Sequence, residues 1–385
     1  MTMVMTVGVD AHKRSCTACT FEDQTKKELF EFPTTNPGLS SFTANVPEGS
    51  VVVIESSTTG KALSRIFSER YQVHMIAPPE RKPSVKTNKR DAERIAKEDM
   101  LGYTRRCYIP SKYIEEMRYI VSRQMRIGEK ISGVKSQIHS LLERNMLQSE
   151  FEDLSDIFGV EGLQRIANLR LPDQEIVELG MHLQELNLYA LQHAQVETEV
   201  AKMAESDGDC CILMSHPGIA PFTALAMKAR IGDVSRFPTK RHLSSYAGLV
   251  PEADNTGEHV SQHRHVKHGD DVLKYAFTCA VKGAVKAKAK TAVKHLYLKQ
   301  IGKGKAPQKA EVAAARKLSW IVWAMLTSKQ RYVEEDRYLT ARKLRDMSSK
   351  ARRDLSYAVH PGDILALAES LTSQAPILQR YPEER

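Results

Sequence analysis

A heptad-spaced row of side chains in the middle of the chain constrains its fold more than any other feature of the sequence. Nine positions, most of them apolar, are separated alternately by three and four residues: Met117, Ile120, Gln124, Ile127, Ile131, Val134, Ile138, Leu141 and Asn145. This spacing places all nine on one face of a single long helix, which is the pattern of a coiled coil. Residues 111–206 are therefore predicted to form long coiled-coil helices.

A second helix is expected at 173–206, because Leu171-Pro172-Asp173 is a typical stop and restart between two helices. Its apolar positions continue the helical spacing: Ile176, Leu179, Leu183 and Leu186. Two such helices form either a hairpin within one chain or a coiled coil between chains. The regular first row favours self-association into a dimer or tetramer, and an internal hairpin is the alternative.

Residues 1–110 show the pattern of an α/β domain. Five short runs rich in β-branched and aromatic residues are expected to be strands: 3–10, 16–21, 27–32, 51–54 and 71–76. Helices are expected to begin with Asn36 as the N-cap and Pro37 in the first turn, to span Thr59 to Arg70, and to begin near Asp91. The order βββαβαβα is that of an RNase H-like domain, although the pattern alone does not separate it from other α/β folds.

Three acidic residues lie at the ends of these elements. Asp10 and Glu55 each follow a buried strand, and Asp91 stands at the start of a helix that follows a basic loop, RKPSVKTNKR. Carboxylates that converge on one point bind Mg²⁺, which phosphoryl transfer uses to stabilise the attacking and leaving oxygens. Each residue alone has an ordinary explanation, such as a helix-start acid favoured by the helix dipole. The three together favour a magnesium site.

The chain as a whole is basic. Lys and Arg number 56 and Asp and Glu 47, which gives a formal net charge of +9 and suits a nucleic-acid partner. Residues 207–330 are expected to form an α-rich domain, and 331–385 a charged, partly disordered tail. Nine lysines and no acidic residue occur between Lys282 and Lys309, and such a run is stabilised by contact with a phosphate backbone.

The turn at HPGIAPFTA, residues 216–224, is similar to that of a helix-hairpin-helix. Gly218 would let the backbone approach a phosphate at the start of the next helix, and an ordinary packing turn is the alternative. Four histidines cluster further on: His259, His263, His265 and His268. They lack paired cysteine or carboxylate ligands at fixed spacing, so a nucleic-acid-facing loop is favoured over a metal site.

The acid-bearing segments VGVDAHKRS, VVIESSTTG and VKTNKRDAERIA resemble the three blocks of the DEDD transposases of the Piv-like insertion-sequence family. The resemblance implies a RuvC-like N-terminal domain. The family's four acidic positions fall on Asp10, Glu55, Asn88 and Asp91, so an amide replaces the third carboxylate. An amide oxygen can coordinate magnesium but brings no charge.

The segment from 212 to 251, which includes IGDVSRF and SYAGLVP, resembles the C-terminal domain of the same family. The family carries a serine beside a glycine after this block, as a nucleophile that links to DNA. Here the block reads GLVPEADNTGEHV, which places Thr256 at the nucleophile position, with Ser261 as a weaker substitute. The resemblance also implies a guide RNA that selects the target DNA by base pairing.

The predicted activity is that of a DNA transposase or site-specific recombinase, which acts on donor and target DNA with Mg²⁺. Its catalytic residues would be Asp10, Glu55, Asn88, Asp91 and Thr256. Basic residues and one glycine are predicted to contact nucleic acid: Lys86, Lys89, Arg90, Gly218, Arg264, Lys267, Lys282, Lys286, Lys288 and Lys290. The alternatives are a metal-dependent nuclease for branched DNA and a decayed relative that binds DNA or RNA without cutting it.

Other classes of protein fit the sequence poorly. No stretch approaches the roughly 20 apolar residues of a membrane-spanning helix, and the N-terminus lacks the basic start of a signal peptide. Six cysteines in 385 residues are ordinary for a protein with reduced thiols. A cytoplasmic location without a membrane partner is expected.

Overall fold

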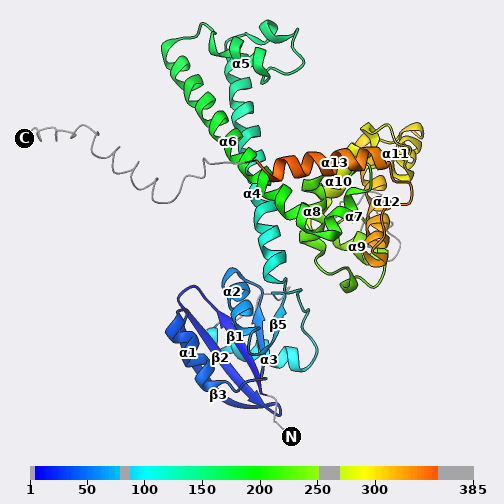
Figure 1. Ribbon diagram of the computed structural model, residues 1–385. Coiled ribbons are helices and arrows are strands. Elements are labelled where there is room, and N and C mark those ends of the chain that lie inside the picture. The colour runs from blue at the N-terminus through cyan, green and yellow to red at the C-terminus, as the bar shows by residue number, and fades with distance from the viewer. Residues whose placement is uncertain (1–4, 79–86, 251–268, 354–385) are drawn as a thin grey trace, which may run out of the picture. The chain divides into compact units, whose positions relative to one another are not determined.

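The computed structural model describes residues 5–78, 87–250 and 269–353 (Figure 1). The chain divides into two compact units, Met1–Tyr113 and Ile114–Arg385. None of the helices in the described ranges is long and apolar enough to cross a membrane.

The first unit is built on a mixed five-stranded sheet in the order β3-β2-β1-β4-β5. Its strands are β1 (Thr6–Ala11), β2 (Ser15–Glu22), β3 (Thr25–Pro33), β4 (Val51–Glu55) and β5 (Gln72–Ile76). The first three strands are antiparallel neighbours, whereas β1, β4 and β5 run parallel. The predicted sequence of elements is confirmed, with boundaries that shift by a few residues.

Helices cover both faces of this sheet. One face carries α1 (Asn36–Asn45) and α2 (Thr58–Phe67), with a core that includes Val7, Val9 and Phe42. The other face carries α3 (Asn88–Met100), which packs on β1 and β2. The N-cap of α1 is Thr35, whose hydroxyl accepts a hydrogen bond from the Gly38 amide, and not Asn36 as predicted. A hydroxyl group on the residue just before a helix can accept a hydrogen bond from a backbone amide of the first turn, as that of Thr35 does.

The second unit begins with two long helices, α4 (Lys112–Arg144) and α6 (Asp173–Ser206), which run side by side in Figure 1. The short helices η1 (Gln148–Phe151) and α5 (Val160–Ala167) lie between them in the chain. Residues of the heptad row, such as Val134, Ile138 and Leu141, are buried in one cluster with Leu179 and Leu186 of α6. The first heptad row thus packs within the chain, and the preference for an intermolecular coiled coil along it was wrong.

The remaining helices enclose one large core. They are α7 (Gly208–Met214), α8 (Pro221–Ile231), η2 (Val234–Arg236), α9 (Lys240–Tyr246), α10 (Asp271–Lys286), α11 (Ala292–Gly302), α12 (Pro307–Ser328) and α13 (Arg337–Ala351). The core contains residues from α4, α6, α8, α10, α12 and α13, among them Met117, Leu225, Phe277, Leu318 and Met347.

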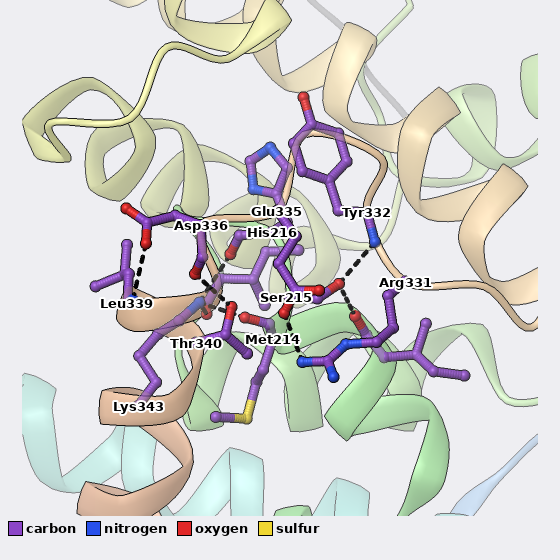
Figure 2. A network of polar contacts seen from close by, with 12 residues as sticks. Met214, Ser215, His216, Arg331, Tyr332, Glu335, Asp336, Leu339, Thr340 and Lys343 are labelled. Atoms are coloured by element: carbon purple, nitrogen blue, oxygen red, sulfur yellow. Dashed lines mark hydrogen bonds and ion pairs between the residues drawn. The ribbon is translucent and has the colours of Figure 1, made fainter.

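The start of the predicted charged tail is part of this core, which corrects the prediction for 331–385 in the range that the structure describes. Met347 and Ala351 of α13 are buried, and the Tyr332 amide donates a hydrogen bond to Ser215 Oγ. Figure 2 shows the Lys343 side chain directed at the turn between α7 and α8. Its ammonium donates to the carbonyl oxygens of Met214, His216 and Ile219. The many charges of α13 lie around a narrow apolar face, which composition alone conceals.

Candidate active site

The sheet places two carboxylates side by side. Asp10 lies near the end of β1 and Glu55 at the end of β4, and these strands are parallel neighbours paired up to Val9 and Ile54. Asp10 and Glu55 are the next residues of the two strands. Side chains alternate between the two faces of a strand, so Asp10 and Glu55 share the face opposite to Val9 and Ile54, which is the face that α3 covers. Asp10 is buried, with 6 % of its surface exposed.

Close packing at Gly8 brings α3 to these carboxylates. A Cβ atom on Gly8 would lie 2.1 Å from the Ala92 carbonyl oxygen and 2.7 Å from the Ala96 nitrogen. Only glycine allows the helix to approach the strand this closely. The helix starts at Asn88 and is capped by the Thr87 hydroxyl, which accepts a hydrogen bond from the Arg90 amide. The first turn of α3 thus carries Asp91, which is 4 % exposed, to the covered face of the sheet.

His12 joins two of the predicted site residues. Its Nε2 atom lies 3.0 Å from Asp10 Oδ2 and 3.2 Å from Asn88 Oδ1. The ring therefore bridges the end of β1 and the start of α3. The sequence analysis did not single out His12, although it belongs to the segment VGVDAHKRS. Its position two residues after Asp10 was the available signal.

Arg94 is the second functional candidate that the sequence analysis missed. Its guanidinium lies 3.6 Å from Asp91 Oδ1 and 4.0 Å from Glu55 Oε1, and it donates a hydrogen bond of 2.9 Å to Glu98 Oε2. Arg94 follows Asp91 by three residues and precedes Glu98 by four, which are the spacings at which helix side chains meet. Nothing in the local sequence indicated that it would also approach Glu55.

The acidic cluster, a candidate metal site, consists of Asp10, Glu55 and Asp91. Their oxygens are the hard ligands that a divalent cation prefers. Asp91 Oδ2 is buried and has no hydrogen-bond partner among the described residues, so one oxygen lacks the pairing that burial normally requires. No group of three or more His, Cys, Asp or Glu side chains in the described ranges is arranged to hold a metal ion. The carboxylate oxygens are thus suitable ligands for a divalent cation. Their side chains would have to change conformation to coordinate one ion together.

The structure describes only some of the residues predicted to contact nucleic acid. Lys89 and Arg90 are exposed in the first turn of α3, next to Asp91. Lys282, Lys286, Lys288 and Lys290 are exposed at and beyond the end of α10, and Lys282 lies 3.8 Å from Glu311. Several predicted positions lie outside the described residues: Lys86, Thr256, Ser261, Arg264, Lys267 and the four clustered histidines.

Gly218 has a packing role, which corrects the predicted phosphate contact. A Cβ atom there would lie 2.1 Å from the Ala280 carbonyl oxygen and 2.7 Å from the Ala284 nitrogen, both in α10. The Gly218 amide donates to His216 Nδ1 at 3.2 Å inside the protein. The glycine therefore admits a helix, and its amide is already paired. The turn between α7 and α8 was predicted correctly, but its glycine faces the interior.

Comparison with known proteins identifies relatives over much of the chain. Residues 210–297 match the family model described as the Transposase IS116/IS110/IS902 family. The chain is 27 % identical to the transposase for insertion sequence element IS1111A of Coxiella burnetii over 271 residues, which cover 67 % of this chain and 72 % of that protein. It is 25 % identical to the transposase for insertion sequence element IS1328 of Yersinia enterocolitica over 243 residues, 61 % of this chain and 71 % of that protein.

A shorter match, 29 % identical over 135 residues, is to a 43.6 kDa protein of the insertion element IS110 of Streptomyces coelicolor, and covers 35 % of this chain and 33 % of that protein. The family model and these relatives all come from insertion sequences. Residues 210–297 are thus similar to the IS116/IS110/IS902 transposase family, and the chain as a whole is similar to insertion-sequence transposases.

Proposed function

We propose that this protein is a DNA transposase that cuts and rejoins DNA at the acidic cluster of an RNase H-like, RuvC-like domain. The observation that carries the proposal is the placement of Asp10 and Glu55 at neighbouring strand ends, with Asp91 delivered to the same face by α3. In sheets with parallel strands, ligands bind beyond the carboxyl ends of the strands. The mixed sheet order β3-β2-β1-β4-β5 is consistent with the RNase H-like assignment.

Asp10, Glu55 and Asp91 would hold Mg²⁺, with Asn88 as a neutral fourth position of the DEDD set. Bound magnesium would stabilise negative charge on the oxygens around the reacting phosphorus. His12 orients Asp10 and Asn88 through its Nε2 atom. Lys89 and Arg90, exposed at the start of α3, and Lys86 would hold the DNA phosphates on either side of the scissile bond.

Thr256 is the proposed nucleophile. Its hydroxyl would attack the phosphorus of a phosphodiester, form a protein–DNA ester and release a deoxyribose hydroxyl, which takes up the proton. One ester bond replaces another, so the DNA can be resealed by the reverse reaction without an energy source. The methyl group of threonine narrows the approach to phosphorus compared with serine. Arg264 and Lys267, close to it in the sequence, would contact the same DNA.

Donor and target DNA are the proposed partners, together with a guide RNA that the resemblance implies. Lys286, Lys288 and Lys290 are exposed and have no carboxylate within ion-pair distance among the described residues. Unpaired cations of this kind bind a phosphate backbone and release its counterions. These lysines and Lys282 therefore form the proposed backbone contact of the second unit.

A homo-oligomer is also proposed, through a face of α6 that the hairpin with α4 does not use. Val177, Met181, Leu188 and Leu191 follow coiled-coil spacing, with Gln184 at the intervening position, and the four apolar side chains are between 50 % and 63 % exposed. A heptad row on one helix can pair with its own copy. Recombination requires two DNA duplexes to be held together, and a dimer or tetramer would do this.

A metal-dependent nuclease for branched DNA is the second candidate, because Asn88 and Thr256 replace the acid and the serine of the family pattern. A nuclease would use water as the nucleophile and would not depend on Thr256. A decayed relative that binds DNA or RNA without cutting would depend on neither the metal nor the hydroxyl.

The test is to incubate the purified protein and the RNA transcribed from its flanking DNA with donor and target DNA, with Mg²⁺ or with EDTA. A covalent protein–DNA adduct is expected on a denaturing gel, only with Mg²⁺, and absent in Thr256→Ala. Cutting without an adduct would favour the nuclease. Binding with neither product would contradict the proposed enzyme.

A further inference from the structure

Arg94 lies close to three acidic side chains, those of Glu55, Asp91 and Glu98, and the proposed mechanism leaves it without a role. Arg94 approaches Asp91 Oδ1 at 3.6 Å and Glu55 Oε1 at 4.0 Å, and only its link to Glu98 has hydrogen-bond length, at 2.9 Å. Its Nε atom is buried and has no hydrogen-bond partner among the described residues, like Asp91 Oδ2. Arg94 therefore offsets part of the negative charge of Asp91 and Glu55, at distances longer than a hydrogen bond.

The positive charge of the Arg94 guanidinium stabilises the carboxylates of Asp91 and Glu55. A divalent cation would stabilise the same carboxylates by coordination. A divalent cation bound in the same region would be repelled by this guanidinium, because like charges at short distance repel each other. Glu98, partly exposed on the same helix, already accepts a hydrogen bond from the guanidinium and would hold it if a metal ion displaced it from Asp91 and Glu55.

We propose that Arg94 is the internal counter-cation of the acidic cluster, which competes with Mg²⁺ and withdraws toward Glu98 when the metal binds. Arg94 is a positioning residue in this scheme and forms no bond to the substrate. The inference rests on the proposed magnesium site. In this scheme, Arg94 keeps the carboxylates close together when no metal is bound. It also lowers the affinity for free Mg²⁺, because the metal must displace the positive charge of the guanidinium.

The test is Mg²⁺ binding by the full-length chain, measured by isothermal titration calorimetry after removal of divalent ions with EDTA and dialysis. A neighbouring full charge changes the proton affinity of a carboxyl group by about ten- to a thousandfold. Arg94→Gln is accordingly expected to bind Mg²⁺ at least about tenfold more tightly than the wild type. Lys97→Gln is the matched control, because Lys97 lies on the same helix and pairs with Glu93 at 2.6 Å; it should leave the affinity unchanged.

A second variant predicts the opposite change and guards against misfolding of the first. Glu98→Gln removes the acceptor that draws the guanidinium away, so Mg²⁺ binding should weaken several-fold. In the double variant Arg94→Gln/Glu98→Gln, this weakening should disappear, because its cause is absent. Loss of the Glu98 charge alone would weaken binding equally in both backgrounds, which would overturn the inference.

Two failures can be told apart. If the wild type binds Mg²⁺ and Arg94→Gln binds it with equal or lower affinity, Arg94 is not a competing cation and only this inference is wrong. If neither protein binds Mg²⁺ while both remain folded by circular dichroism, the magnesium proposal itself fails and the inference fails with it.

Discussion

Each unit buries a polar cluster, and the two clusters differ in how completely their charges are paired. In the second unit, the Lys343 ammonium donates to three carbonyl oxygens and the Ser215 hydroxyl is bonded on both sides (Figure 2). His216 Nε2 in this cluster has no hydrogen-bond partner among the residues that the structure describes, and it belongs to a ring that burial keeps neutral by lowering its pKa to about 3. In the first unit, a buried carboxylate oxygen of Asp91 and the Nε atom of Arg94 have no hydrogen-bond partner among the described residues.

This difference in hydrogen bonding distinguishes a cluster that stabilises the fold from one that binds a ligand. A buried polar network contributes to stability when its atoms are hydrogen-bonded. A buried atom of a charged group without a hydrogen bond costs free energy and persists where another requirement maintains it. We therefore assign a structural role to the Lys343 cluster and a ligand-binding role to the acidic cluster. Each of the following variants tests this assignment, beginning with the largest expected effect.

Asp91→Asn is expected to reduce Mg²⁺-dependent DNA cleavage by at least ~1000-fold, or about 4 kcal/mol of the activation barrier. The substitution keeps the shape of the side chain and removes the charge that would bind the metal. Cleavage is measured on a labelled duplex under single-turnover conditions. Glu93→Gln, on the same helix but paired with Lys26 and Lys97, is the control. Cleavage by Asp91→Asn within tenfold of the wild type would refute a catalytic role for Asp91.

Lys343→Met is expected to lower the free energy of unfolding of the second unit by about 3 kcal/mol, because three carbonyl oxygens lose their donor. Both tryptophans of the chain, Trp320 and Trp323, lie in α12, so fluorescence during urea unfolding reports on this unit. Arg345→Met, at an exposed position of the same helix α13, should change the free energy by less than about 0.5 kcal/mol. A Lys343 variant as stable as the control would show that the network is not structural.

Gly8→Ala and Gly218→Ala introduce the same close contact in the two units and should each cost about 2 kcal/mol of stability. The new Cβ atom would meet a helix carbonyl at 2.1 Å in both cases. Only Gly8→Ala should also abolish cleavage at temperatures where the protein is folded, because it displaces the helix that carries Asp91. Equal loss of cleavage in both variants would remove the distinction between the two glycines.

The smallest effect is the change in stability for a single pH unit. Burial holds the folded-state pKa of His216 near 3, below its ordinary value of 6.5, so between these values the unfolded chain binds more protons than the folded one. Stability should then fall as the pH is lowered from 6.5, by at most roughly 1.4 kcal/mol for each pH unit. His216→Asn keeps an acceptor for the Gly218 amide and should flatten this dependence. An unchanged slope in tryptophan-detected unfolding would mean that other groups cause it.

The strands and their acidic ends were predictable, because β-branched runs such as VVVI before Glu55 leave few alternatives to a buried strand. Contacts between residues that are far apart in the sequence were not predictable. The bridge from His12 to Asn88 and the approach of Arg94 to Glu55 join residues that are far apart in the chain, and no local pattern carries such information.

Three other features show why pattern alone was insufficient. A heptad row indicates that a partner helix exists but not whether it belongs to the same chain, and α4 found its partner in α6. A glycine in a turn can admit a phosphate or a helix, and Gly218 admits α10. A charged segment can still bury a narrow face, as α13 does with Thr340 and Met347.

The most direct test of the contrast between the two clusters is the opening free energy of α3, measured by amide hydrogen exchange in EDTA for the wild type and Asp91→Asn. If the acidic cluster is maintained for ligand binding at a cost in stability, the variant should exchange as slowly as the wild type or more slowly, because a buried carboxylate charge has been removed. Exchange in α3 that is more than tenfold faster in Asp91→Asn would show that Asp91 stabilises the fold, and would contradict the account.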